Sequence, residues 1–177
     1  MHAVLTFGHG TLEADAIVTT LRAARVELLV DIRRFPGSRR HPHLGRLALD
    51  SSLGAAGIHY RWDERLGGRR RPGDDTIDLA LRNDGFRAYA EHMRTPEFLA
   101  GIDDLLRDTS GRRVAVMCSE TVWWRCHRRL VADHLLLVRE VEVSHLMPGG
   151  RAVRHSPTDG VRRRPDGLLT YDAKTLV

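Results

Sequence analysis

The sequence predicts a single α/β domain, a three-layer structure in which a mostly parallel sheet of about five strands has helices on both faces. Short apolar segments alternate along the chain with segments whose apolar residues recur at helical spacing. This alternation is typical of a parallel sheet covered on both faces. The length of 177 residues fits one domain, and a chain of this size can bury a core without disulfides or a metal.

Five apolar segments are expected to form the strands. The clearest is 27–32, which is almost continuously apolar and therefore typical of a strand buried on both faces. The other four strands are expected at 3–7, 58–62, 113–118 and 141–146.

Helical segments lie between these strands. Thr11 is expected to cap the first helix, and Gly57 is expected to end a second helix over 44–56. Phe86 to Met93 marks one helical face, Thr95 and Pro96 begin the next helix, and a last helix contains Val131, Leu135 and Val138.

Three segments lack this periodicity. The prolines in 33–43 indicate a long loop, and 63–85 is expected to be a flexible insertion that acts as a lid. We expect the α/β domain to cover 1–146, and 147–177 to be a basic extension in which 167–171 adds an edge strand or hairpin.

The charge balance points to anionic ligands only where arginines cluster. The net charge is +5, but of the 28 basic residues only Lys174 is a lysine, a bias that codon supply in a GC-rich genome would produce. Arginine suits phosphate and carboxylate, although a solvated basic face explains the clusters as well. They lie at 33–34, 39–40, 69–71, 125–129 and 162–164.

The chain is expected to be cytoplasmic and to make no membrane contact. No apolar run approaches the roughly 20 residues needed to cross a bilayer, and no secretory signal opens the sequence. The two cysteines, Cys118 and Cys126, do not suggest a disulfide scaffold.

Polar residues follow several predicted strands. In parallel sheets ligands bind outside the carboxyl ends of the strands. This rule places His9, Asp31 with Arg33, and Cys118 with Glu120 at one edge of the molecule.

The segment 118–129 holds the densest group of reactive residue types. Cys118 is expected to be a thiolate nucleophile if the following helix lowers its pKa, or else a small buried residue. The loop of the cysteine phosphatases is excluded, because Arg125 follows Cys118 by seven positions rather than six. Glu120 is a general base or the ion-pair partner of an arginine near Arg33 or Arg39.

A metal and a stacking surface are alternative uses of the same segment. Cys118, Cys126, His127 and His9 offer donors for zinc, but no Cys-x2-Cys pair is present, so no metal ligand and no cofactor are assigned. Trp123 and Trp124 either stack on bases or cover an edge of the core.

Several motifs together resemble the bacterial family named domain of unknown function 488. They are 7–11, 30–33 with 35–39, Tyr60 followed by 66–69, and 117–120 with 126–129, so the resemblance runs from the first strand to about Leu146. It implies the fold and a site at His9, Asp31, Arg33, Ser38, Arg39, Cys126, His127 and Arg128. The family has serine where this chain has Gly10, so a ligand contact from that serine is absent here.

We expect an enzyme that acts on a nucleotide or a nucleic acid. In this hypothesis the catalytic residues are His9, Asp31, Cys118 and Glu120. The substrate is bound by Arg33, Ser38, Arg39, Arg69, Cys126, His127 and Arg128. Two alternatives stay open: a non-catalytic module that binds nucleic acid or another anion, and a thiol- or metal-dependent enzyme that acts on a small metabolite.

Overall fold

Six strands form the main sheet of the computed structural model, which describes residues 3–71, 73 and 76–172. Their order is β3-β2-β4-β1-β5-β6, and the first five in this order pair in parallel, as predicted. The sixth strand, which was not predicted, is antiparallel to β5 and lies at the edge. The bounds are β1 Ala3–Gly8, β2 Leu28–Asp31, β3 His59–Trp62, β4 Val114–Cys118, β5 Glu142–Leu146 and β6 Ala152–Arg154.

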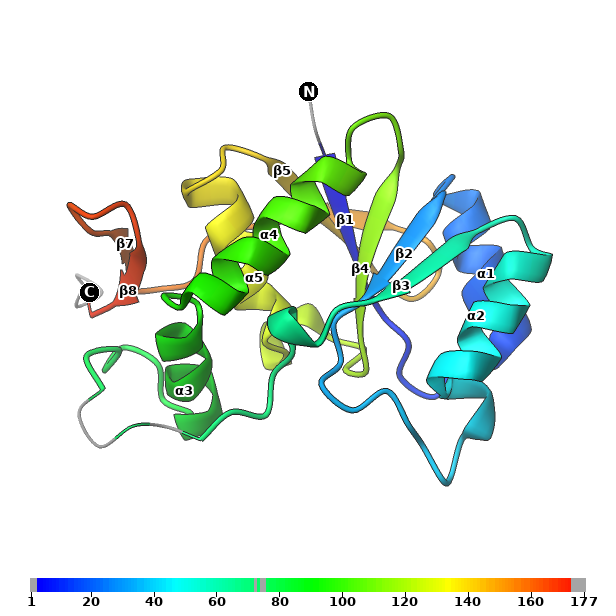
Figure 1. Ribbon diagram of the computed structural model, residues 1–177, viewed down its shortest axis with the longest axis horizontal. Helices are drawn as coiled ribbons and strands as arrows, with labels where there is room; N and C mark the ends of the chain where they lie inside the picture. The colour runs from blue at the N-terminus through cyan, green and yellow to red at the C-terminus, as the bar shows by residue number, and fades with distance from the viewer. Residues whose placement is uncertain (1–2, 72, 74–75, 173–177) are drawn as a thin grey trace.

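Helices cover both faces of the sheet, which confirms the three-layer prediction (Figure 1). Successive side chains of a strand point to opposite faces, so each strand contributes to two cores. One core holds the apolar sides of α1 (Ala14–Ala23) and α2 (Arg46–Ala55). The other holds those of α3 (Asp84–His92), α4 (Pro96–Asp108) and α5 (Arg128–Leu137). Within the described residues, no helix is long and apolar enough to cross a membrane.

The helix boundaries follow the predicted signals except at α1. Thr95 Oγ1 accepts a hydrogen bond from the Phe98 amide, so Thr95 caps α4 as predicted. The expected cap at Thr11 is wrong, because the chain first makes a turn in which Leu12 N donates to His9 O over 2.9 Å. Gly10 occupies the left-handed region in that turn, with φ 52°, and α1 therefore begins only at Ala14.

The start of the predicted insertion is packed into the core. The short 3-10 helix η2 (Glu64–Leu66) follows β3, and Leu66 is completely buried against α4. Asp63 accepts from Arg61 and Arg65 over 2.7 Å each, which fixes the entry to this segment. Residues 72, 74 and 75, which belong to the predicted lid, lie outside the described residues.

A buried chain of hydrogen bonds joins the C-terminal segment to the sheet. Here β7 (Val161–Arg163) and β8 (Leu169–Tyr171) form a hairpin. Tyr171 OH donates to Asp133 Oδ2 over 3.0 Å. The chain continues through Asp133–His155 at 2.9 Å, His155–His145 at 3.0 Å and His145–Thr6 at 2.6 Å.

Candidate functional site

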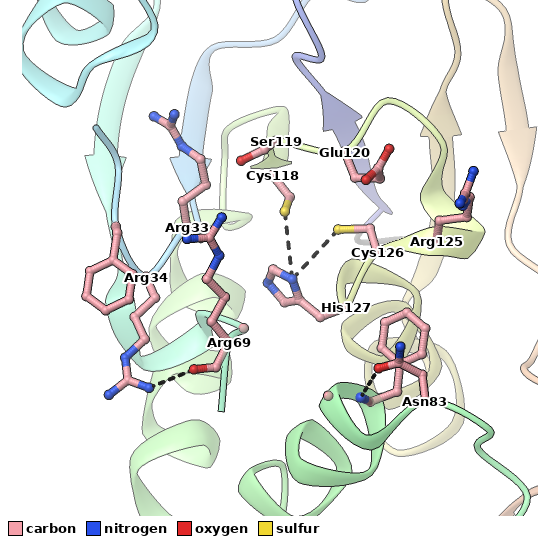
Figure 2. A pocket seen from close by; sticks show the side chains of 14 residues that line it. Arg33, Arg34, Arg69, Asn83, Cys118, Ser119, Glu120, Arg125, Cys126 and His127 are labelled. Atoms are coloured by element: carbon pink, nitrogen blue, oxygen red, sulfur yellow. Dashed lines mark hydrogen bonds between the residues drawn. The ribbon is translucent and has the colours of Figure 1, made fainter. Parts of the chain in front are cut away.

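The carboxyl ends of three adjacent strands meet at one edge of the sheet, as the sequence predicts. The register pairs Gly8 with Cys118, and Asp31 with Met117, so the residues that follow β1, β2 and β4 start at one level. A cavity of about 320 Å³ opens here (Figure 2). It is lined by Arg33, Arg34, Phe35, Gly68, Arg69, Asn83, Gly85, Phe86, Cys118, Ser119, Glu120, Arg125, Cys126 and His127.

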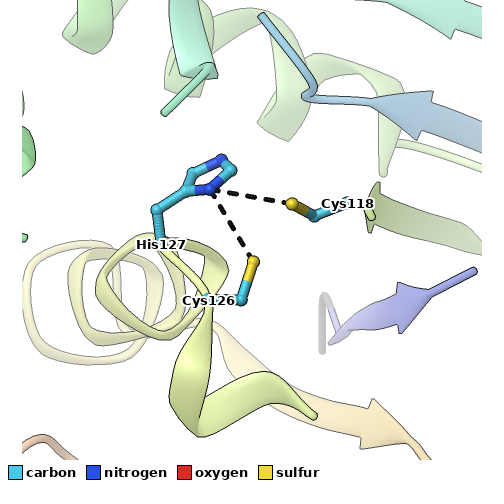
Figure 3. Close-up of side chains that lie close together, drawn as sticks. All are labelled: Cys118, Cys126 and His127. Atoms are coloured by element: carbon cyan, nitrogen blue, oxygen red, sulfur yellow. Dashed lines mark hydrogen bonds between the residues drawn. The ribbon is translucent and has the colours of Figure 1, made fainter. Parts of the chain in front are cut away.

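Two sulfurs and an imidazole converge in the cavity wall. His127 Nδ1 lies 3.7 Å from Cys118 Sγ and 3.7 Å from Cys126 Sγ (Figure 3). All three atoms lie within 4.8 Å of one another. We call these three residues the sulfur–imidazole centre.

Each member of the centre is held by a defined local structure. Cys118 is the last residue of β4, and Cys126 follows the 3-10 helix η3 (Trp123–Arg125), donating its amide to Trp123 O over 3.1 Å. His127 immediately precedes α5. Its ring lies against Gly68, where an added Cβ would come within 2.8 Å of Nδ1. A side chain at position 68 would therefore displace the His127 ring.

The two thiols differ in their affinity for a proton. A hydrogen bond from the Cys126 thiol, together with His127 and the Glu120 amide, lowers the pKa of Cys118 well below its ordinary value, against the opposing effect of burial. Burial and the hydrogen bond to Cys118 raise the pKa of Cys126. Of the two thiols, Cys118 is therefore the one that loses its proton more readily.

A buried arginine lies behind the loop that joins the two cysteines. Arg128 is only 1% exposed, and its Nη2 donates to Thr121 O over 3.0 Å. Its Nε and Nη1 have no hydrogen-bond partner among the described residues. The guanidinium packs on Gly8, where an added Cβ would lie 2.5 Å from Nη1. Arg128 therefore supports the loop from behind and does not line the cavity.

Asp31 and Arg33 form a buried ion pair beside the centre. Asp31 Oδ2 accepts from Arg33 Nη2 and from Tyr60 OH, each over 2.6 Å, and Oδ1 accepts from Arg33 Nε over 2.9 Å. Burial opposes the charge of Arg33, but the hydrogen bonds that Arg33 donates to Asp31 raise the pKa of Arg33. Both carboxylate oxygens are occupied, so the ion pair fixes the orientation of Arg33.

His9 completes this group, which we call the Asp31–Arg33 cluster (His9, Asp31, Arg33 and Tyr60). His9 Nδ1 donates to Gly10 O over 2.8 Å, so Nε2 accepts from Arg33 Nη1 over 3.2 Å. Burial and the Arg33 charge lower the pKa of His9, which favours the neutral ring. Gly10 adjoins Thr121: an added Cβ would lie 2.2 Å from Thr121 Oγ1.

The structure brings some of the predicted site residues to the cavity and places others elsewhere. Ser38 Oγ accepts from the His41 amide in a turn, and Arg39 is exposed on the same loop. Glu120 is exposed and makes no ion pair with any described residue, so the alternative in which it holds Arg33 or Arg39 is wrong. The predicted residues that line the cavity are Arg33, Arg69, Cys118, Glu120, Cys126 and His127.

The other residues that line the cavity were not assigned to the site from the sequence, among them Asn83 and Phe86. Asn83 caps α3, its side-chain oxygen accepting from the Phe86 amide over 3.2 Å, and both residues face the cavity. The signal in the sequence was the cap residue before an apolar helical stripe.

Trp123 stacks on His145 at a centroid distance of 4.2 Å and so covers an edge of the core, while Trp124 is 47% exposed.

Three cavity arginines lack a carboxylate partner among the described residues: Arg34, Arg69 and Arg125. Arg34 Nη1 instead donates to the Arg69 carbonyl over 3.1 Å. Arg69 has φ 56°, a left-handed conformation that is strained for a residue with a Cβ. Figure 2 shows Arg33, Arg34 and Arg69 on one side of the centre and Arg125 on the other.

The donor types of the sulfur–imidazole centre are those that bind zinc and other borderline or soft metals. Within the described residues, one group of side chains could hold a metal ion, and it consists of Cys118, Cys126 and His127. His9, the fourth donor considered from the sequence, belongs instead to the Asp31–Arg33 cluster.

Fold and site together define the class: an α/β protein with a parallel sheet that carries a cysteine-containing polar cavity at its carboxyl edge. The family model described as domain of unknown function DUF488 matches residues 13–135, more than half of the chain. The chain therefore belongs to the DUF488 family. No curated protein and no solved structure matches it.

Proposed function

We propose that the chain is an enzyme that acts on a phosphate-bearing substrate, a nucleotide or a nucleic acid, in the cavity at the carboxyl edge. The observation that carries this proposal is that one cavity contains both the sulfur–imidazole centre and arginines without carboxylate partners. A guanidinium free of a carboxylate has its planar fork available for phosphate oxygens.

The nucleotide class is supported by aromatic rings in the same wall. Phe35 is 63% exposed, and the partly buried Phe86, at the start of α3, lines the same cavity. An exposed aromatic ring beside an arginine offers a face on which a base can stack while the guanidinium binds the phosphate.

The size of the cavity limits what can enter. A volume of about 320 Å³ is at the lower end of small-molecule pockets. This volume is the size of about one nucleotide unit. A nucleic-acid substrate would therefore present a single-stranded end or an extruded nucleotide.

The residues divide into three roles in this proposal. Arg34, Arg69 and Arg125 bind the phosphate, and the sulfur–imidazole centre with the exposed Glu120 carries the chemistry. His9 and Asp31, whose polar atoms are already paired, position Arg33 rather than exchange protons with substrate.

The first test is binding of nucleotides and of single- and double-stranded oligonucleotides across a salt series, for wild type and Arg69→Ala. Loss of one charge-assisted contact should weaken binding of nucleotides and single strands about tenfold. Arg112→Ala is the matched control, because Arg112 is exposed and precedes β4, at the opposite end of the sheet. Equal weakening by both substitutions would indicate nonspecific attraction and would refute the proposal.

The second test separates an enzyme from a binding module. Ligands that bind are incubated with wild type and Cys118→Ser, and products are analysed by mass spectrometry. Turnover by wild type that disappears in Cys118→Ser, with binding retained, supports an enzyme. Binding without turnover would favour the non-catalytic module.

A further inference from the structure

We propose that the sulfur–imidazole centre is a zinc site with three protein ligands and a fourth coordination position that faces the arginine-lined cavity. The ligand atoms are Cys118 Sγ, Cys126 Sγ and His127 Nδ1. The binding of zinc stands on the geometry below, whereas the use of the zinc rests on the proposed function.

The two sulfur–nitrogen separations match those of a tetrahedral zinc ion, and the three donor atoms lie within 4.8 Å of one another. Zn–S bonds of about 2.3 Å and Zn–N bonds of about 2.0–2.1 Å place a sulfur and a nitrogen ligand about 3.6 Å apart. Nδ1 lies 3.7 Å from each sulfur, so zinc fits between the three atoms with small movements.

Hydrogen bonding alone leaves the centre incompletely satisfied. Nδ1 of a neutral imidazole carries at most one proton and can donate to only one of the two sulfurs that flank it. A metal ion would be bound by Nδ1 and both sulfurs at once.

The donors are held in place by regular structure. Cys118 ends a fully buried strand, while Cys126 and His127 stand between η3 and α5. Gly68 and the Tyr89 ring, whose centroid is 4.8 Å from that of His127, fix the imidazole from two further segments. These packing contacts restrict the ring to the orientation in which Nδ1 faces both sulfurs.

The fourth position faces the cavity, because all three ligands line it. Structural zinc sites are closed by four protein ligands, whereas catalytic sites keep one position for water or substrate. Two thiolates neutralise the divalent ion, so the loaded centre adds no net charge to a buried location. Zinc would supply a Lewis acid next to the arginines that bind the substrate phosphate.

Zinc stoichiometry is the first test. Metal-free wild type is dialysed against zinc, and bound metal is measured by mass spectrometry, with cobalt as a second probe for thiolate coordination. We expect one zinc per chain, and a loss of at least about tenfold in affinity for Cys126→Ser and His127→Gln. His59→Gln, an exposed histidine on β3, should bind zinc as wild type does.

Thiol labelling gives a readout that needs no variant. Cys118 and Cys126 are the only cysteines in the chain, so an alkylating reagent reports this centre alone. Zinc should slow the labelling of both residues in wild type. Labelling that zinc does not change, undiminished zinc binding in both ligand variants, or iron in place of zinc in the purified protein would overturn the proposal.

The zinc site and the proposed function can fail separately. One zinc per chain without phosphate binding that depends on Arg69 would retain the metal site and refute the function. Phosphate binding that depends on Arg69 in a chain that binds no zinc would do the reverse.

Discussion

Two clusters at the carboxyl edge of the sheet differ in how completely their polar atoms are paired. In the Asp31–Arg33 cluster each carboxylate oxygen accepts hydrogen bonds, and His9 uses both ring nitrogens. In the sulfur–imidazole centre one nitrogen is shared by two sulfurs, and His127 Nε2 has no partner among the described residues. Paired groups hold a structure together, while incompletely paired groups in a cavity are available to a ligand.

The largest effect should come from breaking the paired cluster. Asp31→Asn removes the charge that compensates the buried Arg33, so we expect unfolding to be easier by about 3–5 kcal/mol. Urea denaturation measures this change. Asp50→Asn, on the exposed side of α2, is the control and should leave stability unchanged. A loss below about 1 kcal/mol for Asp31→Asn, the level of a surface ion pair, would contradict the comparison.

Acid should destabilise the protein at two buried histidines: His145, in the hydrogen-bonded chain that runs from Tyr171 to Thr6, and His134 in α5. Burial, His155 and Arg128 lower the pKa of His145 to about 3, while burial and Arg139 lower that of His134 to about 4. The unfolded rings take up protons near pH 6.5 and the folded rings do not, so stability falls as the pH drops below 6.5. At pH 5 each ring should account for a loss of about 2 kcal/mol.

The measurement is the free energy of unfolding between pH 7 and pH 5. His134→Leu should make the loss over this range smaller by about 2 kcal/mol, because one of the two rings no longer titrates. The same pH dependence in wild type and His134→Leu would show that this ring is not responsible.

Gly68→Ala tests whether the position of the His127 ring controls zinc binding at the sulfur–imidazole centre, because it leaves all three proposed ligands unchanged. The new Cβ would come within 2.8 Å of His127 Nδ1. We expect stability to fall by about 1–3 kcal/mol, as for overpacking elsewhere, and zinc affinity to fall with it. Gly54→Ala on α2 meets nothing within 4 Å and should be neutral or slightly stabilising. Unchanged zinc affinity in Gly68→Ala would show that the imidazole does not depend on this contact.

The smallest effect concerns Arg69, one of the three cavity arginines without a carboxylate partner among the described residues. Because Arg69 has φ 56°, Arg69→Gly should be more stable than Arg69→Ala by about 1 kcal/mol. Phosphate binding should be equally weak in both, since both lack the guanidinium. If the alanine variant is as stable as the glycine variant, the backbone is not strained at this residue.

The sequence predicted the sheet and its edge well because apolar runs report burial directly. The strand ending at Cys118 was recognised from its continuous apolar residues, and the rule for parallel sheets then located the cavity. The sixth strand was missed because Ala152–Arg154 is short, mostly exposed and therefore lacks an apolar signature.

Side-chain partners could not be predicted in the same way. The spacing of Cys118, Cys126 and His127 matches no short metal motif, and only the path through η3 brings the two cysteines together. Asn83 reaches the cavity because α3 packs there, which is a tertiary effect. Ser38, implied by the family resemblance, instead stabilises a turn of its own loop.

The members of the sulfur–imidazole centre are close along the chain as well as in space. Cys118 and His127 are separated by nine positions, so little loop-closure entropy is lost when they meet. Of the three phosphate-binding arginines, Arg125 lies in this same segment, whereas Arg34 follows β2 and Arg69 follows η2. During folding, the three donors can therefore assemble as soon as β4 and α5 dock. Arg34 and Arg69 reach the cavity only when β2 and β3 have joined the sheet.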